Sequence, residues 1–174
     1  MNATPASDGQ WIREAVRRFE VPLTLYAARI VGDADRGRDV VQDAFVRLCG
    51  QAREDVEPRL AEWLYTVCRN RALDVRRKES RMAPLTEVEA ASRPATAPPA
   101  GDAAETREVV SAAVRALETL PPNQQEVLRL KFQHALSYKE IAAVTGLSVS
   151  NVGFLIHTGL KVLRGQMEEF SRLK

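Results

Sequence analysis

The chain has 174 residues, 45% of them hydrophobic, and a net charge of +2, so it can bury a core but has no strong overall charge that would attract nucleic acid. No apolar run approaches the roughly 18 residues that a membrane span needs, and the first residues lack the basic start and apolar core of a secretory signal. Cys49 and Cys68 form no CxxC pair and have no histidine cluster beside them, so we expect two buried, reduced thiols in a cytoplasmic protein without a metal or other cofactor.

Positive charge is spread along the chain rather than gathered in one part. Residues 1–80 hold 14 basic and 13 acidic side chains, residues 81–104 hold 2 and 3, and residues 105–174 hold 9 and 7. Nucleic-acid affinity depends on the number of phosphates that a protein neutralises. Any DNA binding must therefore come from local basic patches or from a partner that brings more positive charge.

Residues 8–80 have the apolar spacing of helices and no alternation with a period of two, which predicts helices without a sheet. The first helix is expected to bury Trp11, Ile12, Ala15, Val16 and Phe19. Proline suits the first turn of a helix, so Pro22 is expected to begin a second helix that stops at the GDADRG segment. A third helix is predicted from near Asp35, and a fourth from about Leu60 to Lys78.

A proline-rich stretch at residues 81–104 separates this part from the rest. It contains much alanine, no sustained apolar period, and four prolines, Pro84, Pro94, Pro98 and Pro99. Prolines at this density break helices and favour extended chain. We therefore expect a flexible linker between two helical domains.

Residues 105–174 predict a second helical domain. Two helices divided by a pair of prolines come first, and two shorter helices follow. Ser137 and Glu140 form an S-x-x-E capping box at the start of the third helix, Gly146 marks a tight turn, and Ser148 suits the N-cap of the fourth. This is the outline of a helix-turn-helix, whose second helix normally enters the DNA major groove.

Four segments of the chain have the order and spacing of a known family. They are DVVQDAFVRL from Asp39, EWLYTVCRNRALDVRR from Glu62, LETLPPNQQEVLRLKF from Leu117 and SYKEIAAVTGLSVSNV from Ser137. Together they resemble the extracytoplasmic-function (ECF) group of bacterial RNA polymerase sigma factors. The resemblance implies an all-α protein with two small domains: a region 2 domain at residues 8–80 for polymerase docking and the minus-ten element, a linker at 81–104, and a region 4 domain at 105–174 for the minus-thirty-five element.

The DVVQDAF segment resembles the part of the family that docks on core RNA polymerase. Its helix has a polar, partly acidic stripe that suits a partner with arginines, and the stripe consists of Asp39, Gln42, Asp43 and Val46. A merely solvated face is the alternative, and the resemblance favours docking. Phe45 is expected in the core rather than at the contact.

The helix predicted from about Leu60 to Lys78 has the densest local positive charge in the chain. Basic side chains neutralise phosphates and aromatic side chains stack on unpaired bases, which suits a melted DNA strand. The resemblance implies that this helix reads the minus-ten element and captures a flipped base, with candidates Trp63, Arg69, Asn70, Arg71, Asp74, Arg76 and Arg77. Core packing is the alternative for Trp63 and the stronger one for Tyr65, and the helix dipole also favours basic residues at 76–78.

The second helix of the helix-turn-helix departs from the commonest family pattern, because it has no Lys or Arg from Ser148 to Leu160. Its apolar positions are expected to face the core. The opposite surface supplies the candidates for the minus-thirty-five element, which are Ser150, Asn151, Gly153, Phe154, His157, Lys161 and Arg164. Asn151 can pair with an adenine edge and Phe154 can touch a thymine methyl group. The alternative is that this surface contacts another protein.

We interpret the chain as a sigma factor that directs core RNA polymerase to specific promoters and assists their opening. The alternative is a stand-alone helix-turn-helix regulator, which needs no docking segment. The sequence has no Gly-rich phosphate loop, nucleophile elbow or paired-carboxylate site, which argues against an enzyme. The expected partners are core RNA polymerase and promoter DNA; an anti-sigma factor is common in the family, but no residue here demonstrates one.

Overall fold

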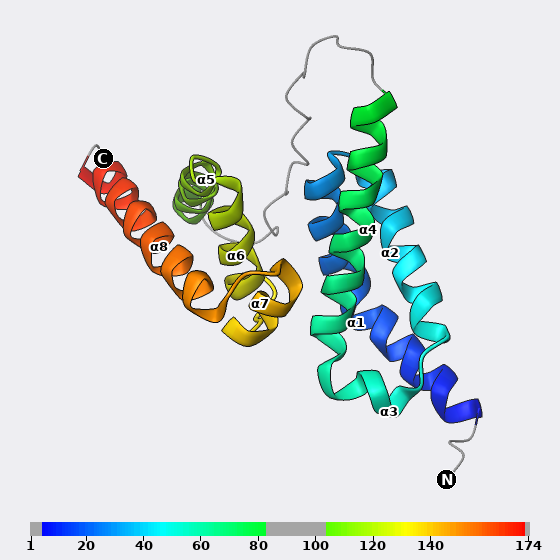
Figure 1. Ribbon diagram of the computed structural model, residues 1–174. Helices are drawn as coiled ribbons and strands as arrows, with labels where there is room; N and C mark the ends of the chain where they lie inside the picture. Colours follow the sequence, from blue (N-terminus) through cyan, green and yellow to red (C-terminus); the bar gives the residue numbers. More distant parts are fainter. Residues whose placement is uncertain (1–4, 83–103, 173–174) are drawn as a thin grey trace. The chain divides into compact units, whose positions relative to one another are not determined.

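The computed structural model describes residues 5–82 and 104–172, and the chain divides into two compact units (Figure 1). Within these described residues both units consist of helices and contain no strand, which confirms the predicted all-α class. The predicted linker at residues 81–104 lies, apart from its two ends, outside the described residues.

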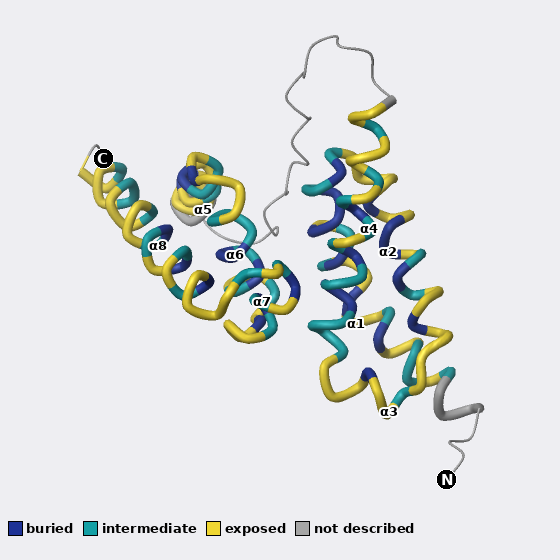
Figure 2. Tube along the Cα trace, in the orientation of Figure 1, coloured by how far each residue is buried: buried dark blue, intermediate teal, exposed yellow. Residues whose placement is uncertain are grey.

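Three long helices form the first unit: α1 (Pro5–Val31), α2 (Ala34–Cys49) and α4 (Leu60–Met82). Each packs against the other two, while the short helix α3 (Arg53–Val56) and the 3₁₀ helix η1 (Glu57–Arg59) connect α2 to α4. Figure 2 shows the buried residues along the sides where the three helices face one another. The fully or almost fully buried side chains include Leu23, Tyr26, Val40, Leu48, Leu64, Tyr65 and Cys68.

The prediction that Pro22 begins a separate helix is wrong, because Pro22 lies inside the single helix α1. A proline inside a helix loses one backbone hydrogen bond and crowds the preceding turn. Here the apolar stripe continues on both sides of it, since Ala15 and Phe19 before it and Leu23 and Tyr26 after it are all buried. Packing of that stripe against α2 and α4 outweighs the local preference of proline.

Two of the helices in the first unit approach very closely at Gly37. A Cβ atom built on Gly37 of α2 would lie 2.8 Å from the backbone nitrogen of Ala28 and 2.9 Å from its Cα atom. Real Cβ atoms do not come so close to a backbone, so only glycine fits here. This contact holds the start of α2, whose N-cap Asp33 accepts a hydrogen bond from the backbone N–H of Arg36, against α1.

The second unit consists of α5 (Ala104–Glu118), α6 (Pro122–Phe132), α7 (Tyr138–Thr145) and α8 (Val149–Arg172), with α8 packed against the other three. The predicted capping box is present, with reciprocal hydrogen bonds between Ser137 and Glu140. Gly146 has a φ of +75°, and the backbone N–H of Asn151 donates to the hydroxyl of Ser148. The chain bends by 105° between α7 and α8, as in a helix-turn-helix.

The two cysteines lie in different environments. Cys68 is fully buried, and this burial raises the pKa of its thiol to about 12. Cys49 is exposed, so the expectation that it is buried is wrong. Cys49 is the last residue of α2, and the buried stripe of that helix ends one residue earlier at Leu48.

Candidate polymerase and nucleic-acid interface

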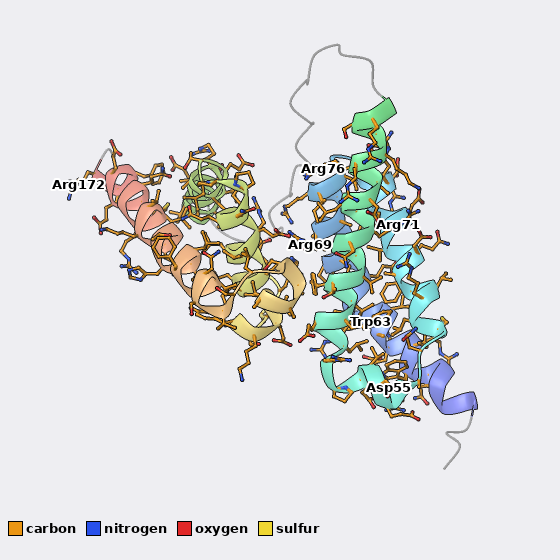
Figure 3. All side chains as sticks on the ribbon, in the orientation of Figure 1. Asp55, Trp63, Arg69, Arg71, Arg76 and Arg172 are labelled. Carbon is orange, nitrogen blue, oxygen red and sulfur yellow. The ribbon has the colours of Figure 1, made fainter. Side chains whose placement is uncertain are left out.

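The charged side chains of α4 point in different directions around the helix. Figure 3 shows Arg69 and Arg76 on one side of α4 and Arg71 on the side toward α2. Asn70 and Arg76 are exposed, while Arg69 is half-buried. Arg77 is exposed and its Nη1 lies 3.2 Å from Oδ1 of Asp74. The sequence therefore located a basic helix, but its arginines do not form one common surface.

Arg71 is paired with Asp43, which was predicted from the sequence to lie on the stripe that docks on the polymerase. Its Nε donates a hydrogen bond to Oδ2 of Asp43 on α2 at 2.8 Å. The Arg71 side chain is 33% exposed and that of Asp43 48%. A second ion pair, between Arg36 and Glu79, also joins the two helices. Between the helices lies a cavity of about 160 Å³ lined by Arg36, Asp39, Val40, Asp43, Arg71, Val75 and Glu79.

The outer stripe of α2 remains accessible apart from Asp43. Asp39 and Gln42 are exposed, and Val46 is 67% exposed although it is apolar. Phe45 is half-buried, so it belongs to the core only in part. An exposed apolar side chain between polar ones is suited to a protein contact, because covering it with a partner removes apolar surface from water.

The two aromatic residues at the start of α4 differ in accessibility. Tyr65 is 1% exposed and packs edge to face on Tyr26, with ring centroids 5.2 Å apart. Burial raises the pKa of its hydroxyl above the ordinary value. Tyr65 is thus a core residue, which confirms that core packing was the better prediction for it. Trp63 is half-buried and retains surface at which a base can stack.

The outward surface of α8 contains most of the residues expected there. Ser150, Asn151, Phe154, His157, Lys161 and Arg164 are exposed, and Phe154 is 63% exposed. The apolar positions behind them face the core, with Val152, Ile156 and Gly159 buried.

Gly153 differs from the other candidates on α8. A Cβ atom on Gly153 would lie 3.6 Å from Cε2 of Tyr138, so this position faces α7. Gly153 was expected on the outward surface of α8, but it lies beside the Tyr138 ring and not in open solvent. Thr158, five residues further along α8, also makes internal hydrogen bonds: its hydroxyl donates to the carbonyl of Phe154 and accepts from Nε2 of Gln124, each at 2.8 Å.

Metal binding and membrane insertion are two further possibilities for residues 5–82 and 104–172. No group of three or more His, Cys, Asp or Glu side chains in these ranges is placed to hold a metal ion. No single helix among them combines the length and the apolar composition that a membrane crossing requires, and only α7 and α8, taken together as a bent pair, meet those requirements.

Comparison with known proteins identifies the family. Residues 15–82 match the Sigma-70 region 2 family, and residues 111–163 match the Sigma-70, region 4 family. The chain is 30% identical to the ECF RNA polymerase sigma factor EcfG of Rhodopseudomonas palustris over 144 residues, which cover 81% of this chain and 76% of EcfG. The chain belongs to the ECF family of RNA polymerase sigma factors. The resemblance seen in the sequence and the function that it implied are confirmed, and a stand-alone regulator is not favoured.

Other relatives of this sigma factor agree. It is 29% identical to the RNA polymerase sigma-E factor of Streptomyces coelicolor over 154 residues, which cover 88% of the chain and 84% of that protein. It is 26% identical to SigE of Mycolicibacterium smegmatis and spans 62% of that protein's length. A solved structure of the sigma factor RpoE in complex with the anti-sigma factor NepR, from Bartonella quintana, has the same fold, with a TM-score of 0.65, 21% identity, and coverage of 90% of this chain and 96% of RpoE.

One exposed residue of the sigma factor that suits a DNA contact was not predicted from the sequence. Lys139, in the first turn of α7, is exposed. The first helix of a helix-turn-helix crosses the DNA backbone, so a basic side chain there can meet a phosphate. Tyr138 beside it is held in place, because Nζ of Lys131 lies 5.5 Å from its ring centroid and Gly153 lies against its edge. The sequence does contain a signal for this residue, because Lys139 lies two positions after Ser137, which caps the first helix of the helix-turn-helix.

Proposed function

We propose that the two units of this sigma factor divide the work of promoter recognition. Residues 8–80 dock on core RNA polymerase and act on the minus-ten element, residues 105–174 act on the minus-thirty-five element, and residues 81–104 link them. The observation that supports this division best is the packing of α2 beside α4 in one compact unit, separate from the unit that contains α8. A polymerase bound to the outer stripe of α2 thereby fixes where α4 meets DNA.

For the docking surface we propose Asp39, Gln42 and Val46 as direct contacts with the polymerase. Their exposure supports this role, and the exposed Val46 supplies the apolar surface that a stable interface covers. Asp43 was expected in the same set. Its hydrogen bond to Arg71 supports a contribution through the position of α4, with a direct contact limited to the part of its carboxylate that remains exposed.

For the minus-ten element we propose Trp63, Asn70, Arg76 and Arg77 as the contacts with single-stranded DNA. Trp63, Asn70 and Arg77 are spaced by seven residues, or two helical turns, so they follow one face of α4. Arg69 and Arg76 follow the adjacent face. Arg71 and Asp74 belong to the set through the ion pairs that they form with Asp43 and Arg77. Phosphate contacts from the arginines and stacking on Trp63 suit a melted strand.

For the minus-thirty-five element we propose the outward surface of α8, with Ser150, Asn151, Phe154 and His157 at the bases and Lys161 and Arg164 at phosphates. Gly153 supports it indirectly, through its contact with Tyr138. The net charge of +2 for residues 105–174 gives little affinity for DNA by itself. Tethering to the polymerase raises the effective concentration of the unit at the promoter.

The remaining partners and properties follow from this role. Sigma factors are in general not enzymes, and we propose that this one performs no covalent chemistry, since the polymerase makes the RNA. We also propose an anti-sigma factor as a partner, because RpoE, which shares the fold, was solved with the anti-sigma factor NepR. Core RNA polymerase acts in the bacterial cytoplasm, so we propose the cytoplasm as the location.

Size-exclusion chromatography with the core RNA polymerase of the host bacterium tests the docking proposal. The full chain is expected to elute with the polymerase, and a Gln42→Ala, Val46→Asp double variant is expected to elute mostly alone. The matched control is Asp35→Asn, which alters an 81% exposed charge elsewhere on α2 and should elute like the wild type. Elution of the wild type apart from the polymerase would contradict the proposed function, and unchanged co-elution of the double variant would contradict the proposed surface.

A further inference from the structure

The surface of α8 that points away from the core is narrower than its sequence suggests. Gly153 faces Tyr138, and the hydroxyl of Thr158 is hydrogen-bonded to Phe154 and Gln124. In the first three turns this leaves five exposed positions, which we call the reading face: Val149, Ser150, Asn151, Phe154 and His157. The N-terminal residues of the second helix are those that contact base edges in a helix-turn-helix.

The chemistry of the reading face is unusual in what it lacks. Guanine is most often read by Arg or Lys at its O6 and N7 atoms, and cytosine by Asp or Glu at its amino group. None of these four residue types occurs between Ser148 and Leu160. Adenine is read by the amide of Asn or Gln, and the methyl group of thymine by an apolar side chain. The reading face contains one such amide, Asn151, and two apolar side chains, Val149 and Phe154, of which Phe154 is the more exposed.

Asn151 and Phe154 are positioned to act on neighbouring base pairs. They are three residues apart, so they lie on the same side of the helix. The backbone N–H of Asn151 is held by the hydroxyl of Ser148, which fixes the first turn. Phe154 is 63% exposed, so most of its ring is in water until a partner covers it. A thymine methyl group is a partner of the right polarity for such a ring.

We propose that the second unit reads an upstream promoter element composed of A·T pairs, in which Phe154 contacts a thymine methyl group and Asn151 pairs with an adenine edge. This inference rests on the proposed function of the unit and specifies its ligand. Phosphate contacts come from the exposed basic residues on either side of the reading face, Lys139 before it and Lys161 and Arg164 after it. Base contacts then set the sequence, while these three residues set the register.

Selection from a promoter library tests the class of element. Core RNA polymerase with the full-length chain transcribes a library in which the minus-thirty-five region is random and the rest of the promoter is kept. A·T pairs are expected at the positions that become enriched. Enrichment of G·C pairs overturns the inference but leaves the sigma factor role intact. Enrichment of no sequence there overturns it in favour of a protein contact by this surface, and a lack of transcription from any template contradicts the proposed function as well.

Replacing single thymines of the selected element by uracil tests the contact with Phe154, because uracil lacks only the methyl group. For the wild type, one such replacement is expected to lower promoter affinity roughly threefold to tenfold. The Phe154→Ala variant is expected to bind thymine and uracil promoters equally. Phe132→Ala is the matched control, since Phe132 is 61% exposed in the same unit but lies at the end of α6. The control is expected to lose as much affinity as the wild type when thymine is replaced by uracil. If Phe154→Ala also loses that much affinity on this replacement, the proposed contact is overturned.

Discussion

Arg71 of α4 donates a hydrogen bond from its Nε to Oδ2 of Asp43 on α2, at 2.8 Å, and so connects the helix proposed to touch DNA with the helix proposed to touch polymerase. The two residues are 28 positions apart in the sequence. Because each neutralises the other, neither charge is fully available to an outside partner. The main effect of this pair is therefore to hold α2 and α4 in place relative to each other.

Reversal of both charges tests this pairing. Asp43→Arg and Arg71→Asp are each expected to lower the free energy of unfolding by about 1 kcal/mol, a modest loss because the pair is partly exposed to water. The double variant, with the charges exchanged, is expected to recover most of the loss. Urea denaturation measures all three, with Glu20→Gln, at an exposed position of α1, as a control that should change little. Additive losses in the double variant would show that the two side chains do not interact.

The same pair shows why the sequence could not complete the site. Helical spacing correctly placed Asp39, Gln42, Asp43 and Val46 on one stripe, because a period of 3.6 residues is a local property. Which of these side chains reaches a neighbouring helix depends on tertiary packing, and no local pattern marks Asp43 as the one that does. The same limit applies to Gly153, whose position looks outward on a helical wheel but faces Tyr138.

Gly37→Ala is expected to destabilise the first unit. The new Cβ atom would lie 2.8 Å from the backbone of Ala28, which cannot rotate away, so α1 and α2 must separate. Forcing an extra carbon into a packed contact typically costs about 1–3 kcal/mol. Thermal unfolding followed by circular dichroism measures the loss. Gly9→Ala is the control in the same unit, because its nearest neighbour, at 3.8 Å, is the end of the Arg13 side chain; equal melting temperatures for the two variants would contradict the prediction.

Thiol labelling distinguishes the two cysteines. At pH 8 a thiol reagent is expected to modify one cysteine of the native protein, Cys49, because that side chain is exposed. Cys68 should not react, since it is fully buried and its pKa of about 12 keeps it protonated. Both should react in denaturant, and a Cys49→Ser variant should show no rapid reaction when folded. Rapid modification of two thiols in the native wild type would mean that the core of the first unit opens readily.

The predictions that depended on hydrogen bonds between residues close in sequence agree with the structure. Those that required local preferences to be weighed against tertiary packing do not. The capping box at Ser137 and the turn at Gly146 were found where expected, because hydrogen bonds within a few residues define them. Pro22 was misplaced, since its local preference for a helix start is weaker than the packing of the long apolar stripe of α1. Cys49 was misplaced because burial was inferred from residue type alone.

Lys139→Ala is expected to weaken binding to all promoters by a similar factor. A phosphate contact carries no base information, so its loss lowers affinity without changing sequence preference, and it reduces the slope of affinity against salt concentration by about 1. Competition between promoters at several salt concentrations, with core RNA polymerase present, measures both quantities. Arg172→Ala, at the far end of α8, is the control and should leave the slope unchanged. A change of base preference in Lys139→Ala would contradict a pure phosphate contact.

In the proposed complex, α4 holds a melted promoter strand while α2 is docked on the polymerase. Permanganate footprinting of a promoter bound by core RNA polymerase and this sigma factor tests it most directly, because permanganate attacks unpaired thymines. The wild type is expected to make thymines of the minus-ten element reactive. The double variant Asn70→Ala, Arg76→Ala shortens two exposed side chains of α4. It is expected to lose that reactivity while it still elutes with the polymerase. Equal reactivity with the wild type and this variant, or no reactivity with the wild type, would contradict the account.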